Sequence, residues 1–247
     1  WPSAPLYTSF VDWKSLGSHA KRFRTWDIHT SWVQTNPLVK AFHSPLRFLA
    51  PKVWESFDLS GYDVVLSSSG WFMCRGVKVV PPAVHICYLH HPPRNLYGYA
   101  TGRTFQKYAL VRAYATIINF FMRQYDYKTA QQVDYFIANS EETARRAQKF
   151  YRRASHVIYP PVDMPTSEAE GEQKNRRYYL SVGRLVWAKQ TELLVKVANM
   201  RKFPLKIVGT GPDESNLRAL SGPTVEFMGS VSDAELERLY AGAKATV

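Results

Sequence analysis

Cysteine is scarce in this chain of 247 residues, which contains only Cys74 and Cys87. Neither lies in a CxxC pair or beside a set of histidines, so the sequence indicates no zinc site and no disulfide framework. Long apolar runs are also lacking, and the chain opens on Trp1 with no basic segment and no signal stretch. We therefore expect a protein of the reducing cytoplasm that needs no cofactor.

Acidic side chains are few in the first part of the chain. Residues 1–157 carry 20 Lys and Arg against nine Asp and Glu, whereas residues 158–247 carry 12 against 11. The net charge of +12 therefore belongs almost wholly to the first part. Such a surface attracts nucleic acid, an anionic membrane or a phosphorylated acceptor, and charge alone does not choose among them.

Length and composition predict two packed domains. The hydrophobic content is 45% and the aromatic content is 14%, which is typical of globular proteins. A polar stretch over residues 162–175 indicates a linker, so we predict a first domain over 1–161 and a second over 176–247. Strand and helix patterns alternate on both sides of it, which predicts α/β domains with doubly wound parallel sheets.

The first domain shows its pattern mainly after residue 60, because the segment before it is typical of loops and short helices. Strands are predicted over residues 63–66, 84–89 and 133–138. The first two run into the loops Ser67–Gly70 and His90–Pro93. Apolar residues at spacings of three and four predict a long helix over 104–132. A second helix is predicted from Asn139–Ser140, a helix-capping pair, to about Tyr151.

The second domain carries the clearest sign of chemistry. We predict a strand over YYLSVGRL, a helix beginning at WAKQTELL, and two further strands ending in IVGTGP and VEFMGS. Gly183 interrupts the first strand, and Arg184 and Lys189 then place two cations at a strand-to-helix turn. Ligands of parallel sheets bind at the carboxyl ends of strands, where helix N-termini favour anions. The arrangement suits a diphosphate.

Several motifs resemble one known family. The segments VGRLVWAKQTELLV, IVGTGPDESNLRAL and VEFMGSVSDAELERLYAGAKATV resemble, in that order, the donor-binding domain of family 4 glycosyltransferases. Upstream, GYDVVLSSS, HICYLHHPPR, VDYFIANSEETARR and VIYPPVD resemble the acceptor-side domain of the same family. The resemblance runs from about Ala4 to the end of the chain. It implies the GT-B fold, two Rossmann-like domains facing across a cleft, and a retaining mechanism.

The resemblance also implies roles for residues of the second domain. Arg184 and Lys189 are expected to bind the donor diphosphate and to stabilise the charge of the leaving group. Gly183 is expected to let the backbone approach the donor. The remaining donor-binding candidates are Gly209, Gly211, Met228 and Gly229. A GxG pair without a third glycine is by itself more typical of a tight turn.

On the acceptor side, the resemblance points to His90 as a catalytic residue. It is expected to hold a hydroxyl of the donor sugar or to shape the acceptor pocket, and a capping or packing role is the alternative. The further candidates at this cleft are His91, Arg94, Asn139 and Ser140. His91 is more typical of a packing histidine, and Asn139 with Ser140 is more typical of a helix cap.

The chain departs from the family pattern at both ends. The glycine-rich loop after the first strand is missing, and so are two downstream glutamates spaced eight residues apart. We therefore expect the chain to be truncated at both ends, with both domains incomplete and with weak or no turnover alone. It also has no DxD cluster, and the family mechanism needs no metal.

We predict a retaining glycosyltransferase that moves a hexose, by overall resemblance mannose, from a nucleoside-diphosphate sugar to a glycan or a lipid-linked acceptor in cell-surface polysaccharide synthesis. The helix over 105–128 is too short in its apolar core to cross a bilayer, and its basic, aromatic face indicates either a peripheral membrane contact or a core helix. The alternatives are an inactive sugar-nucleotide-binding fragment, a basic nucleic-acid-binding module and, less well supported, a nicotinamide-dependent oxidoreductase. Nucleic acid is not the expected partner.

Overall fold

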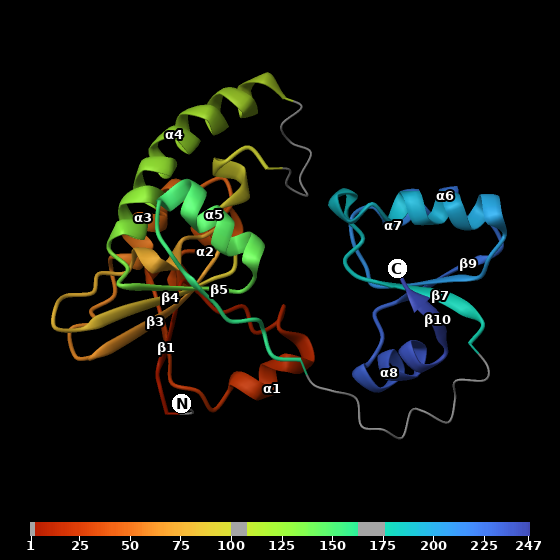
Figure 1. Cartoon of the computed structure of the whole chain (residues 1–247), viewed down its shortest axis with the longest axis horizontal. Helices are drawn as coiled ribbons and strands as arrows, with labels where there is room; N and C mark the ends of the chain where they lie inside the picture. Colours follow the sequence, from red (N-terminus) through yellow and green to blue (C-terminus); the bar gives the residue numbers. More distant parts are fainter. Residues whose placement is uncertain (1–2, 100–107, 163–175) are drawn as a thin grey trace. The chain divides into compact units, whose positions relative to one another are not determined.

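The computed structural model describes residues 3–99, 108–162 and 176–247 (Figure 1). The described residues up to Pro160 form one compact unit, here unit 1, and those from Pro161 onward form a second, unit 2. Each unit has its own parallel sheet and its own buried clusters. The predicted α/β class with parallel sheets is therefore confirmed.

Unit 1 is built from six strands and five α-helices among its described residues. The strands are β1 Leu6–Thr8, β2 Ile28–Thr30, β3 Val64–Ser69, β4 Val84–Leu89, β5 Tyr135–Ala138 and β6 His156–Val157. The α-helices are α1 Ala20–Phe23, α2 Pro37–Ala41, α3 Ala50–Trp54, α4 Ala109–Gln131 and α5 Glu141–Tyr151. Short 3₁₀ helices connect them: η1 Gly17–His19, η2 Trp32–Thr35, η3 Arg47–Leu49, η4 Cys74–Gly76 and η5 Arg94–Leu96.

The main sheet of unit 1 is parallel, with strand order β3-β4-β5-β6. Side chains along a strand alternate between the two faces of a sheet, and in β4 His85, Cys87 and Leu89 are buried. They lie on the face that packs against the C-terminal half of α4 and against α5. On the opposite face, Val64 and Leu66 are exposed. A second, two-stranded sheet pairs β1 with β2 in parallel.

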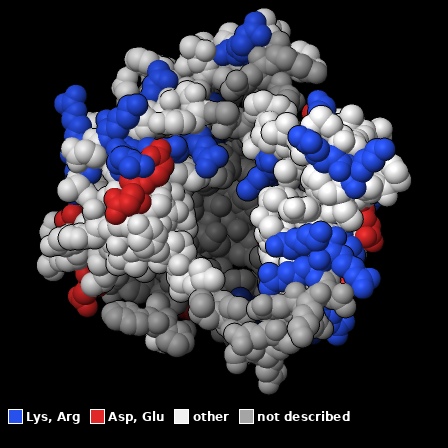
Figure 2. Space-filling view, turned by 45° about the vertical axis from the view of Figure 1, so that its right-hand side comes forward, with Lys and Arg blue, Asp and Glu red and all other residues white. Residues whose placement is uncertain are grey.

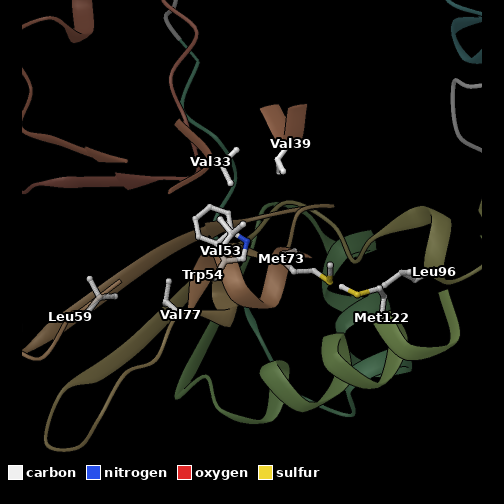
Figure 3. Packing of buried hydrophobic residues seen from close by; sticks show 10 residues of the cluster. Val33, Val39, Val53, Trp54, Leu59, Met73, Val77, Leu96 and Met122 are labelled. Carbon is white, nitrogen blue, oxygen red and sulfur yellow. The ribbon is translucent and has the colours of Figure 1, made fainter. Parts of the chain in front are cut away.

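A hydrophobic cluster joins the N-terminal segment of unit 1 to α4. Figure 3 shows Met73, from the loop after β3, beside Met122 of α4, with Trp54 and Val53 of α3 next to them. The indole nitrogen of Trp54 donates to the carbonyl oxygen of Phe72 at 2.7 Å. Burying a large apolar side chain contributes roughly 1.5–3 kcal/mol. This cluster therefore holds the loop after β3 firmly in place.

A buried ion pair anchors the same loop. Arg75 and Asp126 are both fully buried, and the Arg75 guanidinium donates to the Asp126 carboxylate. Arg75 also donates to Tyr151 Oη at 3.1 Å and to Ser69 Oγ at 3.2 Å, while Tyr97 Oη donates to Asp126 Oδ2 at 2.7 Å. Because a buried charge without its partner is costly, this network links the end of β3 to α4 and α5.

The described part of unit 2 is a four-stranded parallel sheet with helices on both faces. Its strands are β7 Tyr178–Val182, β8 Leu205–Val208, β9 Val225–Gly229 and β10 Ala243–Thr246, in the order β10-β7-β8-β9. Its helices are η8 Trp187–Lys189, α6 Thr191–Arg201, α7 Glu214–Leu220 and α8 Asp233–Ala241. One cluster contains residues of α6 and α7, and another contains Leu239 of α8. This is the doubly wound arrangement.

The predicted helix start at Trp187 is wrong. Residues Trp187–Lys189 form a single 3₁₀ turn, and α6 begins at Thr191. Gln190 lies between them in the left-handed region, with φ of 55°. A right-handed helix cannot run through such a residue, so the turn and the helix are separate elements.

Two element predictions in unit 1 are also corrected, and two short strands were missed. Ser67–Ser69 belong to β3 and pair with Cys87–Leu89 of β4, so they are not a loop. The strands β1 and β2 were not predicted, because three residues are too few to show an alternating pattern. Helix α4 begins at Ala109, since Tyr108 is extended, and residues 104–107 lie outside the described part.

The helix α5 matches its prediction from Glu141 to Tyr151. Its cap is also confirmed, because the Ser140 hydroxyl accepts a hydrogen bond from the backbone N–H of Thr143 at 3.3 Å. Within the described ranges, no helix combines the length and the apolar character that a bilayer crossing requires.

Candidate functional site

A cavity of about 330 Å³ opens at the carboxyl end of β7 in unit 2. Its lining comes from the end of β7, the turn that follows it and the start of α6, including Gly183, Arg184, Lys189, Gln190 and Thr191. This is the edge of a parallel sheet at which ligands bind in α/β folds. The structure therefore brings Gly183, Arg184 and Lys189 together around one cavity.

The turn between β7 and α6 fixes the two cations. Leu185 is buried between them, and the backbone N–H of Lys189 donates to the carbonyl of Val186 at 2.9 Å. Arg184 and Lys189 are both exposed, and neither side chain has an ion-pair partner within the described ranges. Gly183 has open space where a side chain would stand, so its backbone is accessible from the cavity.

The first turn of α6 adds to the positive potential. Helix N-termini carry unpaired N–H groups and the positive end of the helix dipole, and α6 has no side-chain cap. Two uncompensated cations and a helix start converge on the same cavity. Such a site suits a ligand with more than one negative charge, such as a diphosphate.

Gly209 and Gly211 lie outside the lining of this cavity. Gly209 has φ of 126°, and a side chain there would collide with the carbonyl oxygen of Gly183. A side chain at Gly211 would collide with the carbonyl oxygen of Leu185 in the same way. Both glycines thus allow two loops to pack backbone against backbone, which gives them a structural reason independent of any ligand.

Met228 and Gly229 end the neighbouring strand β9. Met228 is half-buried and packs against the cluster of Leu180 and Val208. Gly229 has φ of 67°, and its carbonyl accepts a hydrogen bond from the N–H of Gly209 at 2.7 Å. The two residues therefore stand beside the Gly209 turn, on the edge of the sheet that also holds the cavity.

His90 lies at the corresponding edge of unit 1, directly after β4. Its Nε2 is 2.8 Å from Ser68 Oγ, and its ring meets the ring of Tyr88 edge to face at 5.3 Å. The N–H of His90 donates to the carbonyl of Ser69 at 2.9 Å, and its carbonyl accepts from Thr143 Oγ1 at 3.0 Å. The imidazole is exposed, while its backbone is held on both sides.

His91 and Arg94 follow in the same loop. His91 is half-buried, its Nδ1 is 2.9 Å from the carbonyl oxygen of Pro92, and burial lowers its pKa. These features are typical of a packing histidine. The Arg94 side chain is exposed at the start of η5. Of this pair, Arg94 alone presents its charged group to solvent.

Asn139 and Ser140 complete this edge at the end of β5. The Ser140 hydroxyl caps α5 and also donates to Asn139 Oδ1 at 3.1 Å. The N–H of Asn139 donates to the carbonyl of Leu89, the last residue of β4. The ends of β4 and β5 thus bring the two residues to the same sheet edge as His90.

Sequence reasoning missed Ser68 and Gln190. Ser68 holds the imidazole of His90, but this contact depends on the register of β3 against β4, which no local motif shows. Gln190 lines the cavity from a left-handed position that most glutamines do not adopt. No residue pattern indicated either of them.

Comparison with known proteins bears on both units. Residues 17–164, more than half of the chain, match the family model described as Glycosyltransferase Family 4. The chain belongs to glycosyltransferase family 4. Residues 165–247 match the model described as Glycosyl transferases group 1, so the cavity of unit 2 lies within a glycosyltransferase sequence. No curated protein matches the chain.

Solved structures also resemble this family 4 chain. One is described as "Crystal structure of accessory secretory protein 1,2 and 3 in Streptococcus pneumoniae", with 12% identity and a TM-score of 0.39. The alignment covers 86% of this chain and 39% of that one. The present chain therefore spans well under half the length of that structure's chain.

Proposed function

We propose that the protein is a retaining glycosyltransferase that transfers a hexose from a nucleoside-diphosphate sugar to a hydroxyl of a glycan or lipid-linked acceptor. Mannose is the proposed sugar, on the resemblance to polysaccharide mannosyltransferases, and cell-surface polysaccharide synthesis is the proposed setting. Two family matches support the class of reaction. The observation that carries the proposal is the pair of uncompensated cations, Arg184 and Lys189, at the cavity of unit 2.

In the proposed reaction, the bond between the anomeric carbon and the diphosphate oxygen breaks as negative charge builds on the diphosphate. Arg184 and Lys189 stabilise that charge, which is greater in the transition state than in the bound donor. The acceptor oxygen bonds to the same face of the anomeric carbon, and its proton passes to an oxygen of the departing phosphate. The configuration is retained without a covalent enzyme intermediate.

The other candidate residues of unit 2 have supporting roles in this proposal. The accessible backbone of Gly183 approaches the diphosphate. The turn of Gly209 and Gly211 fixes the loop that carries Arg184, because it packs against the carbonyls of Gly183 and Leu185. Met228 and Gly229 contact the nucleotide base.

The carboxyl edge of the sheet in unit 1 is the proposed acceptor side. His90 binds a sugar hydroxyl there, since its imidazole is exposed and its backbone is fixed. Arg94 adds positive charge to the same loop. His91, Asn139 and Ser140 shape this edge through packing and helix capping.

We also propose that unit 1 lies peripherally on an anionic membrane. The buried residues of α4 begin at Met122. Its preceding turns expose an apolar stripe to solvent, in which Leu110 is 87%, Ile117 59% and Phe121 61% exposed. Exposed Leu38 of α2 and exposed Phe42, which directly follows α2, belong to the same unit. Residues 1–157 carry 20 Lys and Arg against nine Asp and Glu, and Figure 2 shows several groups of Lys and Arg on one face of the whole chain. Apolar stripes with flanking cations bind anionic lipid surfaces.

Replacing Lys189 by alanine tests the proposed function. The release of nucleoside diphosphate from sugar nucleotides is measured for the protein and for Lys189→Ala, with GDP-, UDP- and ADP-hexoses as donors. We expect the rate to fall by two or more orders of magnitude, by analogy with the loss of a single oxyanion-stabilising group.

Lys196→Ala is the matched control for this experiment. Lys196 lies on the same helix α6 and pairs with Glu192 outside the cavity. We expect this variant to keep the wild-type rate within about threefold, since exposed ion pairs contribute little. Equal rates for Lys189→Ala and Lys196→Ala would contradict the assignment of Lys189.

A further inference from the structure

The three consecutive serines at the end of β3 bind three different side chains. Strand alternation turns Ser67 and Ser69 to the buried face, where Ser67 Oγ lies 2.9 Å from His85 Nε2 and Ser69 Oγ accepts from Arg75. Ser68 alone points to the exposed side. Its Oγ lies 2.8 Å from Nε2 of His90.

The geometry of this contact is set by the backbone. Ser68 pairs with Tyr88 in the parallel ladder, and His90, two residues after Tyr88 and directly after the end of β4, carries its side chain on the same side as Tyr88. The Sγ of Cys74 donates to the carbonyl oxygen of Ser68 at 3.0 Å. The neighbouring Ser69 accepts from the fully buried Arg75. Ser68 is therefore a fixed support for the imidazole.

The contact also bears on the position of the imidazole proton. Among the described residues, Ser68 Oγ has no hydrogen-bond partner other than His90, and Nδ1 of His90 has none. When the serine hydroxyl donates to Nε2, the single proton of the neutral imidazole must lie on Nδ1. When Nε2 carries the proton instead, the serine proton has no protein acceptor in the described part of the chain, so each arrangement leaves one donor to solvent. In both arrangements the contact occupies Nε2 and leaves Nδ1 free for a ligand.

We propose that Ser68 is a positioning residue that holds the imidazole of His90 at Nε2 and so presents Nδ1 of His90 to a sugar hydroxyl. This inference rests on the proposed function for the identity of the ligand. It does not rest on it for the hydrogen bond, which is a property of the free protein. The bond is exposed, so its contribution to the free energy of unfolding is small.

Two variants of Ser68 test the proposal. Ser68→Ala removes the hydroxyl, and Ser68→Thr keeps it on a residue that strands favour. The hydrogen bond is read from the ¹⁵N chemical shifts of the His90 imidazole, and its signals are assigned by their loss in His90→Gln. We expect the Nε2 shift of the wild type to be kept in Ser68→Thr and to change in Ser68→Ala.

Kinetics give the second measurement, with the sugar-transfer assay run on the same proteins. We expect kcat of Ser68→Ala to fall about tenfold, the equivalent of one hydrogen bond, with an unchanged KM for the donor and with recovery in Ser68→Thr. Thermal unfolding should stay the same in all three proteins.

The two measurements separate the possible failures. An unchanged Nε2 shift in Ser68→Ala would overturn the inference, whatever the activity. An unchanged kcat in Ser68→Ala, with an active wild type, would overturn it as well. A wild type that transfers no sugar would agree with the weak or absent turnover expected of this chain alone, and the Nε2 shift would then decide whether Ser68 positions His90.

Discussion

Individual side chains of unit 1 show how burial and polarity are balanced beside the candidate site. His85 lies on the buried face of β4, where its Nε2 is 2.9 Å from Ser67 Oγ. Its backbone N–H donates to Asp134 Oδ2 at 2.7 Å. Burial lowers the pKa of His85 to about 4, against an ordinary value of 6.5. The native protein therefore holds this imidazole in its neutral form.

His85 makes the stability of the fold depend on pH. Between about pH 6.5 and pH 4 the unfolded chain binds a proton at this position and the native chain does not. The stabilisation that neutral His85 contributes to the free energy of unfolding is thus fully present above pH 6.5. It is lost as the pH falls toward 4, by at most about 1.4 kcal/mol per pH unit. We expect the free energy of unfolding, measured in urea at pH 7, 6 and 5, to decrease accordingly.

The variant His85→Gln isolates this effect, because glutamine keeps a polar group beside Ser67 but does not titrate. The difference between the wild type and His85→Gln should shrink as the pH is lowered from 7 to 5. A difference that stays constant over this range would contradict the assignment, since other titrating groups contribute equally to both proteins.

At the same scale, the sequence predicted part of the candidate site. Gly183, Arg184 and Lys189 follow a strand pattern within seven residues, so local order was enough to place them at one turn. The contact between Ser68 and His90 joins residues 22 positions apart. It depends on strand register, which a single sequence does not show.

At the scale of elements, the end of α5 has a strained backbone conformation. Arg152 closes α5 in the left-handed region, with φ of 57°, and its side chain is exposed. Glycine adopts this conformation without the steric cost that a β-carbon brings. A glycine at position 152 would therefore end α5 in the same conformation without this steric cost.

The variant Arg152→Gly is expected to raise the free energy of unfolding by about 1 kcal/mol. Arg152→Ala is the control, since it removes the guanidinium but keeps the β-carbon, and it should give no such gain. Urea unfolding of the three proteins provides the comparison. Equal stabilisation by both variants would show that the charge of Arg152, and not its backbone conformation, is responsible.

Elements were predicted best where the pattern was long or capped. The helix α5 has its cap at Ser140 and its acidic first turn, and its prediction was confirmed. The start of α6 was misplaced, because the left-handed Gln190 follows a 3₁₀ turn whose residues also favour helices. Among the described residues, β1 and β2 pair only with each other, and such short strands leave no periodic signal.

At the scale of the whole molecule, the excess of positive charge lies in the first 157 residues, which carry 20 cationic and nine acidic side chains. The same part of the chain carries the exposed stripe of α4. We expect the protein to sediment with vesicles that contain anionic phospholipid and to stay in the supernatant when the vesicles are neutral. Raising the salt concentration should weaken this binding, because the attraction is screened within about 10 Å at 0.1 M salt.

The double variant Ile117→Gln, Phe121→Gln tests whether the stripe takes part. Both side chains are exposed, so the fold should be unaffected, and we expect binding to anionic vesicles to weaken at least tenfold. Met200→Gln, on an exposed position of α6, is the control and should bind as the wild type does. Unchanged binding of the double variant would contradict the role of α4.

The central claim is that unit 2 binds a nucleoside diphosphate through Arg184 and Lys189. Titration calorimetry with GDP, UDP and ADP tests it most directly, using the wild type and the double variant Arg184→Ala, Lys189→Ala. We predict that the wild type binds one of the three nucleotides and that the double variant binds it at least about 100-fold more weakly. Equal affinity in both proteins, or no binding of any nucleotide by the wild type, would contradict the account.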